Sequence, residues 1–472
     1  MTIIFTVLTY FFFLLLLSRL TAGRGDNRAF FRANGRSPWY MVAFGMIGAS
    51  ISGVTFVSVP GMVLSNDMTY LQTCLGFIIG YFLVAFVLLP VYYRLQLTTI
   101  YSYLATRLGQ RSYKTGASFF LISKMTGAAV RFYIVCIILQ HYVFDTLSLP
   151  FPLTTTAMVF LIWLYTRRGG IKTLVITDVL QTLCMFVAQT LIIVHVCQAL
   201  HFSPSEAVEA VMADSRSRVF VFDDWMSKDY FWKQFLSGIF IVIVMTGLDQ
   251  DMMQKNLTCK SLREAQKDMC SYGFAFVPAN LLFLALGVLL AQLCAARGMA
   301  LPTQGDELLP MFAASGWLGE TVVVLFTIGI VAASFSSADS ALTALTTSFC
   351  VDICEQPSDE RLRKRAHATI ALVFVLFILF FKQVNSTSVI NAIYVLCSYT
   401  YGPLLGLFAF GLLTHRRTND RWVPYIAVAS PVCCYLLSVF TAHVFDYHFG
   451  YELLMLNGFL TFIALWALSK KQ

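Results

Sequence analysis

Long apolar segments recur along almost the whole chain, and they restrict the fold more than any other feature. A helix needs about 20 apolar residues to cross the hydrocarbon core of a bilayer. Barrel strands are excluded, because the apolar runs are too long and do not alternate polar with apolar residues. The sequence therefore predicts an all-α polytopic membrane protein with about thirteen transmembrane helices, at residues 3–19, 39–64, 69–93, 115–144, 151–166, 174–200, 231–252, 270–296, 319–350, 367–384, 388–414, 422–443 and 450–468.

The charge distribution predicts how these helices are oriented. Only 12% of the 472 residues are charged, against roughly 25% in soluble domains, and the net charge is +8. If the N-terminus lies outside, most of the 33 Lys and Arg residues fall in inner loops, including 19–36, 94–114 and 255–267. This asymmetry follows the positive-inside rule and explains the net charge better than nucleic-acid binding does. We therefore expect a multi-pass inner-membrane protein with a retained first helix and a cytoplasmic C-terminus.

Two of the spans contain residues that interrupt helices. The run at 39–64 reads WYMVAFGMIGASISGVTFVSVPGMVL, and the run at 231–252 carries Thr246 and Gly247 at a similar relative position. A simple kink accounts for such residues as well as an unwound segment does, and unwound backbone is tolerated at membrane depth only where protein or water covers it. Each interrupted run opens a set of five spans. The distribution of Lys and Arg residues between the loops, called the charge map below, gives the two sets opposite orientations. Inverted repeats of this kind are typical of secondary transporters.

The repeat pattern predicts the organisation of the chain as one membrane domain. Short connections join most of the spans, and the longest outer loops, 201–230 and 297–318, do not resemble separate domains. The predicted parts are an extra N-terminal helix with a cytoplasmic loop (1–38), a first inverted repeat (39–200), an extracellular loop (201–230), a second inverted repeat (231–414) and two C-terminal helices (415–472).

A cluster of hydroxyl residues interrupts one apolar run, in the segment AASFSSADSALTAL. Ala333, Ser336, Ser337 and Ser340 share one helix face, with Asp339 beside it. Hydroxyl and carboxylate oxygens are ligands that a hard cation such as Na⁺ prefers. The serines also suit a small-residue packing face with hydroxyls bonded to their own helix. That alternative does not account for Asp339, because an intramembrane carboxylate is a functional candidate by default.

A second carboxylate, Asp178, lies near the predicted cytoplasmic end of the 174–200 run. It is either an interfacial residue or part of a cation path that leads inward. The sequence leaves both interpretations open.

Three segments carry a resemblance to a known family. RGGIKTLVITDVLQ, TGLDQDMMQKNLTCKSLREAQKDM and AASFSSADSALTALTTSFCVDI are similar to diagnostic segments of the sodium:solute symporter family, which includes sodium–sugar, sodium–proline and sodium–sialic acid transporters. GASISGVTFVSVPGMV and TIYSYLATRLGQRSY also fit, in the right order over essentially the whole chain. The resemblance implies a leucine-transporter-like fold of two inverted five-helix repeats, with one helix before them and two after.

The resemblance also implies ligands for Na⁺ as the transported coupling ion. The shared sodium site of the family would use the carbonyls of Gly48, Ile51 and Ala333 together with the hydroxyls of Ser336 and Ser337. Some sialic acid transporters of the family have an additional sodium site nearer the cytoplasm, and its positions match Asp178, Ser336, Asp339 and Ser340. Asp339 stands where that site has a hydroxyl residue, so it would strengthen cation binding, accept a proton or pair with a nearby base.

The substrate residues implied by the resemblance lie around the first interruption and on the next two spans: Ser50, Ser52, Thr55, Phe56, Gln72 and Arg131. Arg131 either binds a substrate carboxylate or pairs with a protein carboxylate or helix-end carbonyls. The hydroxyl-rich interruption favours a carboxylated sugar, such as sialic acid, or another small organic anion, and a neutral sugar is the alternative.

The sequence thus predicts a sodium-coupled symporter that imports a small organic solute by alternating access. The expected partners are the solute and the lipid bilayer, without nucleic acid, and the expected functional unit is a monomer. An intramembrane hydrolase is disfavoured because His141 and His195 accompany no nucleophile motif. A channel or sensor built on the same fold is a further alternative. Coupling to H⁺ in place of Na⁺ stays open.

Overall fold

The computed structural model describes residues 2–21, 26–145, 148–313, 316–384, 389–447 and 449–470. Over these residues the chain is helical and forms no strand, apart from two isolated bridges. Residues 22–25, which belong to the predicted first inner loop, lie outside the described part. The helices are α1 (Thr2–Thr21), α2 (Asn27–Arg32), α3 (Trp39–Ser50), α4 (Gly53–Asn66), α5 (Tyr70–Leu83), α6 (Leu89–Arg94), α7 (Ser102–Arg107), α8 (Gln110–Leu139), α9 (Phe151–Gly169), α10 (Ile171–Leu200), α11 (Pro204–Ala213), α12 (Phe231–Val242), α13 (Gln250–Asn256), α14 (Leu262–Ala296), α15 (Leu308–Ala313), α16 (Glu320–Ser348), α17 (Glu360–Val384), α18 (Val389–Leu413), α19 (Val423–Phe445) and α20 (Leu453–Ala467).

Each apolar run predicted from the sequence coincides with a helix, a helix joined to a π-helical segment, or a bent pair of helices. Within the described residues, eight helices are long and apolar enough to cross a membrane, and ten are if each bent pair counts as one span. The helix α20 and the described part of α1 are apolar but shorter. The chain is therefore an all-α multi-pass membrane protein, and the count of thirteen spans stays a prediction.

Both predicted interruptions break their helices. The axis turns by 60° between α3 and α4, where Ile51 and Ser52 have non-helical backbone angles. It turns by 70° between the segment Phe231–Gly247 and α13. The alternative of a simple kink is therefore wrong for both spans, since each one has a non-helical connection. Each break thus interrupts the helical hydrogen bonds of its span and leaves backbone groups that need other partners.

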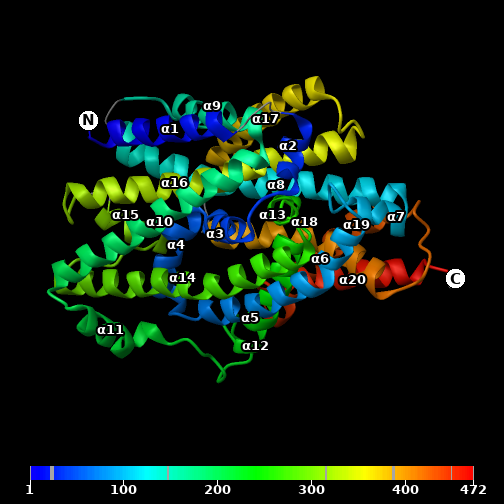
Figure 1. Ribbon diagram of the computed structural model, residues 1–472. Coiled ribbons are helices and arrows are strands. Elements are labelled where there is room, and N and C mark those ends of the chain that lie inside the picture. The colour runs from blue at the N-terminus through cyan, green and yellow to red at the C-terminus, as the bar shows by residue number, and fades with distance from the viewer. Residues whose placement is uncertain are drawn as a thin grey trace.

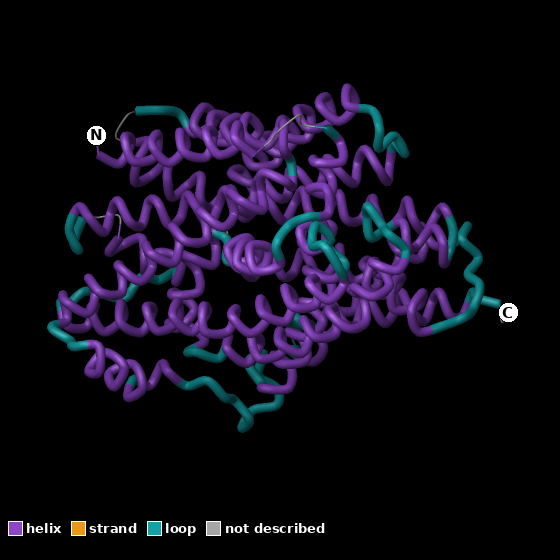
Figure 2. The backbone as a smooth tube through the Cα atoms, viewed as in Figure 1, coloured by secondary structure: helices purple, strands orange, loops and turns teal. Residues whose placement is uncertain are grey.

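The helices lie side by side in a stack that places these breaks near its centre. Figure 1 shows α1, α9 and α17 along one side, α5 and α12 along the other, and α3 and α13 in the middle. The two termini lie at opposite ends of the long helices, and α11 lies outside the stack on the connection to α12. The smooth trace in Figure 2 shows the same arrangement, with loops confined mainly to the ends and to the central breaks.

Small residues let several helices approach closely, as is common in membrane proteins. Gly238 of α12 faces the backbone of α5, and a Cβ atom built on it would lie 2.3 Å from the Thr73 carbonyl oxygen. Gly76 of α5 faces α12 in the same way, with the Phe235 carbonyl oxygen 2.1 Å from its built Cβ position. The two helices can keep this separation only while both positions lack a side chain.

We expect Gly238→Ala to lower the apparent melting temperature of the detergent-solubilised protein. The added methyl group collides with backbone, which cannot move aside, so overpacking should cost about 1–3 kcal/mol. Gly127→Ala is the matched control, because no atom lies within 4 Å of its built Cβ. Equal melting temperatures for the two variants, measured by fluorescence-monitored unfolding, would contradict the close approach of α5 and α12.

Candidate cation and substrate site

Glycines hold the first broken helix against α10. A Cβ built on Gly48 would lie 1.9 Å from Thr182 Oγ1 and 3.1 Å from its Cα, and a Cβ on Gly45 would lie 2.9 Å from Asp178 Cβ. Only glycine therefore fits at position 48, and the end of α3 rests directly on the helix that carries Asp178. This contact places the predicted carbonyl ligands and the predicted inward carboxylate in one region.

The break between α3 and α4 presents free oxygen atoms to α16. The Ser52 N–H donates to the Ser50 carbonyl at 3.0 Å, so the Gly48 carbonyl lacks the donor that a continuing helix would supply. The Ser337 hydroxyl donates to the Ala49 carbonyl at 2.9 Å and contacts the Ala333 carbonyl at 3.3 Å. Neutral hydroxyl and carbonyl oxygens of this kind suit Na⁺. The structure thus brings Ser337 and Ala333 to the break that carries Gly48 and Ile51.

Ser336 is directed away from this break. Its hydroxyl is fully buried and donates to Asp178 Oδ1 at 2.8 Å, while Asp178 Oδ2 lies 2.7 Å from Lys255 Nζ. The charge map assigned Lys255 to an inner loop, and that assignment is wrong: the residue belongs to α13 and is 1% exposed. The burial of Lys255 could have been predicted from its position one turn after Asp251, on the segment that follows the second break.

Asp339 lies in a separate set of hydrogen bonds. It is fully buried, its Oδ2 accepts the Tyr165 hydroxyl at 2.6 Å, and its Oδ1 accepts the Ser340 hydroxyl at 3.3 Å. Of the predicted second set, the structure therefore joins Ser336 to Asp178 and Ser340 to Asp339. Sequence reasoning missed Tyr165, which lies on α9.

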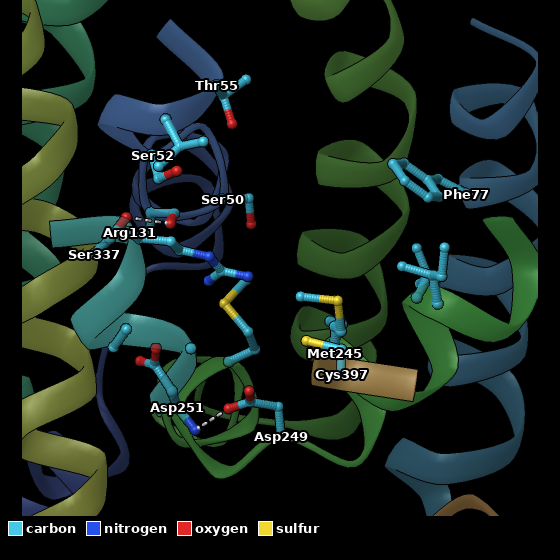
Figure 3. A pocket seen from close by; sticks show the side chains of 18 of the residues that line it. Ser50, Ser52, Thr55, Phe77, Arg131, Met245, Asp249, Asp251, Ser337 and Cys397 are labelled. Carbon is cyan, nitrogen blue, oxygen red and sulfur yellow. Dashed lines mark hydrogen bonds between the residues drawn. The ribbon is translucent and has the colours of Figure 1, made fainter. Parts of the chain in front are cut away.

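A central cavity of about 120 Å³ lies beside the first break. Of the predicted substrate residues, it is lined by Ser50, Ser52, Thr55 and Arg131 (Figure 3). Ser50 shares a short hydrogen bond with the Tyr272 hydroxyl, which accepts from Tyr81 at 2.7 Å. Ser337 also lines the cavity, so one candidate sodium ligand borders the same space as four of the candidate substrate residues.

Arg131 extends its guanidinium group into this cavity. In Figure 3 the group lies between Ser50 on one side and Asp249 and Asp251 on the other, opposite an apolar wall that includes Met245. Among the described residues, the structure gives Arg131 no ion pair and no hydrogen-bond partner. The sequence left open whether Arg131 binds a substrate carboxylate or pairs with a protein group. Among the described residues, no protein group pairs with it.

The floor of the cavity is a buried charge cluster that sequence reasoning missed. Lys124 Nζ lies 3.1 Å from Asp249 Oδ2 and 2.7 Å from Asp251 Oδ2, and the Tyr401 hydroxyl donates to Asp249 at 2.7 Å. Asp249 also caps α13, since its Oδ1 accepts the Asp251 N–H at 2.8 Å. The available signals were a lysine inside a span and two aspartates next to a predicted break.

Two predicted substrate residues lie away from this cavity. Phe56 is fully buried and packs edge-on against Phe283, with ring centroids 5.5 Å apart. Gln72 binds the loop before α12: its amide nitrogen donates to the Asp229 carbonyl at 2.9 Å, and its oxygen accepts the Val221 N–H at 3.1 Å. Neither side chain lines the cavity.

A second, wider cavity of about 540 Å³ adjoins the first. Tyr70 lines both cavities. The wider one is bordered by the loops around Asp229, Gln304 and Glu452, which belong to the end of the molecule that the charge map places outside. Tyr70 therefore separates the central cavity from a cavity at that end.

Comparison with known proteins agrees with this geometry. The sequence profile of the sodium:solute symporter family matches residues 30–421. The chain belongs to the sodium:solute symporter family. Sodium-coupled solute symport is therefore its function, and Na⁺ is its coupling ion.

Individual relatives are distant but cover most of the chain. The sodium/sialic acid symporter NanT of Aliivibrio fischeri is 24% identical over 458 residues, which cover 92% of this chain and 87% of NanT. SiaT of Proteus mirabilis, also a sodium/sialic acid symporter, is 23% identical and covers 85% of this chain and 82% of its own. A solved outward-open structure of a Na⁺-coupled sialic acid symporter superimposes with a TM-score of 0.85 at 20% identity, covering 99% of this chain and 98% of the other. This likeness establishes the leucine-transporter-like fold.

We expect Ser337→Ala to raise the Na⁺ concentration needed for half-maximal thermal stabilisation about 10- to 150-fold, because a lost polar contact to an ion costs about 1.5–3 kcal/mol. The measurement is the melting temperature of the purified protein during titration with NaCl at constant ionic strength. Thr327→Ala is the control on the same helix, since its hydroxyl bonds only to the Val323 carbonyl of its own turn at 2.8 Å. An unchanged NaCl titration for Ser337→Ala would refute its role as a ligand.

Proposed function

We propose that this symporter imports a small carboxylated solute, with sialic acid as the first candidate, together with Na⁺ that enters down its gradient. The observation that carries the proposal is the Arg131 guanidinium, which lies in the central cavity without a protein partner among the described residues. A guanidinium matches a carboxylate with two parallel hydrogen bonds. The names of the two relatives described above support sialic acid as the first candidate.

The charges around the cavity explain why solute and ion would bind together. Lys124 and Arg131 balance Asp249 and Asp251, so a carboxylate that binds to Arg131 adds an uncompensated negative charge. A Na⁺ ion at the break between α3 and α4 would compensate it across a short distance in a medium of low dielectric constant. Each ligand then strengthens the binding of the other, which is the reciprocal coupling that symport requires.

The same site gives Na⁺ a structural effect. An ion held by the break and by Ser337 would join α3 and α4 to α16 and favour the conformation in which the cavity accepts solute. Separation of these helices in the inward-facing state would then release the ion past Asp178. The membrane potential contributes about 2.3 kcal/mol per net charge moved for each 100 mV, so it adds nothing when one Na⁺ ion enters with one carboxylate.

The alternatives differ from this proposal in measurable ways. A neutral sugar has no carboxylate to form two parallel hydrogen bonds with the Arg131 guanidinium, so it would bind without the contact on which the proposal rests. A channel would not accumulate solute against its gradient, whereas a symporter does so as long as the Na⁺ gradient persists.

The organisation of the chain is part of the proposal. We infer that residues 39–200 and 231–414 form two inverted repeats, each of which opens with one of the broken helices, and that 1–38, 201–230 and 415–472 are additions to them. The N-terminus would face outward and the C-terminus inward in the cell inner membrane, which the excess of basic residues in the predicted inner loops supports. The functional unit would be a monomer without nucleic-acid or catalytic activity.

The test is uptake of radiolabelled sialic acid into proteoliposomes with an inward Na⁺ gradient. We expect accumulation that disappears in choline chloride or after a Na⁺ ionophore is added. Uptake of glucose or galactose in place of sialic acid would favour the neutral-sugar alternative, and uptake that stops at equal concentrations would favour a channel.

Arg131→Lys should raise the KM for the carboxylated solute about tenfold and Arg131→Gln by more than about a hundredfold, because the first loses paired geometry and the second loses the charge. The Na⁺ dependence of thermal stability should persist in both variants. Arg297→Gln is the control, since Arg297 is exposed in the loop after α14. A normal KM in Arg131→Gln would exclude a carboxylate subsite at this residue.

A further inference from the structure

We propose that the ammonium group of Lys255 takes the place of a second cation, so that this protein binds and transports a single Na⁺ ion with each solute molecule. The inference rests on the proposed function and specifies its stoichiometry. It departs from the expectation that Asp178, Ser336, Asp339 and Ser340 hold a second sodium ion. The decisive observation is that the Lys255 ammonium lies 2.7 Å from Asp178, where it already compensates the charge of that carboxylate.

Both oxygen atoms of Asp178 already have a neighbour within the protein, and one of these neighbours is a cation. Oδ1 accepts the Ser336 hydroxyl at 2.8 Å, and Oδ2 lies 2.7 Å from Lys255 Nζ. A metal ion at this carboxylate would have to approach next to an ammonium group that already neutralises it. Both partners of the ion pair are almost completely buried, with side chains 1% and 2% exposed, so little water is available to screen the repulsion between two cations.

The other carboxylate does not restore the site. Asp339 accepts the Tyr165 hydroxyl at Oδ2 and the Ser340 hydroxyl at Oδ1. Ser336 therefore directs its proton toward Asp178, and Ser340 directs its proton toward Asp339. The four residues form two hydrogen-bonded sets instead of one shell of oxygen atoms around a common centre.

Lys255 joins the same elements that a second ion would join. It lies on α13, directly after the second break, while Asp178 lies on α10 and Ser336 on α16. The chain Lys255–Asp178–Ser336 thus links the second broken helix to two long helices through one positive charge. Because the ammonium is covalently attached, it provides this link without dissociating, and it cannot carry charge across the membrane in each cycle.

A cycle with one Na⁺ ion concentrates the solute less than a cycle with two, but it uses fewer Na⁺ ions per solute molecule. One Na⁺ per cycle makes the limiting solute ratio proportional to the first power of the Na⁺ gradient, and two would make it proportional to the square. The buried pair also explains why a lysine is tolerated here: an unpaired ammonium in a membrane interior is unfavourable, and so is an unpaired carboxylate.

The experiment is a count of bound radioactive Na⁺ on the purified full-length protein in detergent, at saturating Na⁺. We expect about one ion per chain for the unchanged protein and about two for Lys255→Met, because removal of the ammonium leaves Asp178 open to a metal ion. Lys255→Arg should again bind one. Lys260→Met is the matched control, since the same chemical change is made at an exposed position five residues later, and one ion is expected.

The double variant Lys255→Met/Asp178→Asn provides a check that does not depend on the fold tolerating an unpaired carboxylate. It removes both charges and should bind one ion. Two ions on the unchanged protein, or one on a folded Lys255→Met variant, would overturn the inference and leave the proposed function intact. Absence of Na⁺ binding in the unchanged protein would overturn both. If Lys255→Met does not fold, the count on the unchanged protein decides.

Discussion

The contact between the broken end of α3 and the long helix α10 is the constraint on which the rest of the site depends. In lipid, free backbone groups are tolerated only where protein or water covers them. Here Gly48 allows the backbone of α3 to rest on Thr182, and Ser337 of α16 supplies a hydroxyl to the Ala49 carbonyl at 2.9 Å. The break is therefore enclosed by two helices, and the Gly48 carbonyl beside it lacks the donor that a continuing helix would supply.

Two buried lysines lie against carboxylates near this contact. Lys124 balances aspartates at the second break, and Lys255 balances Asp178 at 2.7 Å. An isolated buried charge is strongly unfavourable, so each ammonium group stabilises carboxylates that would otherwise be costly to bury. Arg131 differs from both lysines, since its guanidinium faces the cavity instead of a described carboxylate. Arg131 is therefore the cation that can bind a solute, because Lys124 and Lys255 already lie against carboxylates.

Much of the fold could be predicted because hydrophobic length and helix-breaking residues act locally. The thirteen apolar runs matched helices, and the glycines and hydroxyls near Gly48 and Thr246 marked real breaks. The candidate site was predictable only in part. Ser337 reached the break as its helix position indicated, whereas Ser336 turned to Asp178 and Gln72 bound a loop. Their partners come from distant segments, and spacing within one helix carries no information about them.

The sequence by itself determined that the chain spans a membrane, where its helices are interrupted, and which helix face carries hydroxyl groups, because these properties follow from the order of residues along one segment. Only the tertiary structure decided which charge meets which. Lys255 reads as a loop residue in the sequence, yet the turn of 70° before α13 carries it into the interior, where it pairs with Asp178. Ion pairing in a medium of low dielectric constant depends on distances between helices, and those distances are set by packing across the whole bundle.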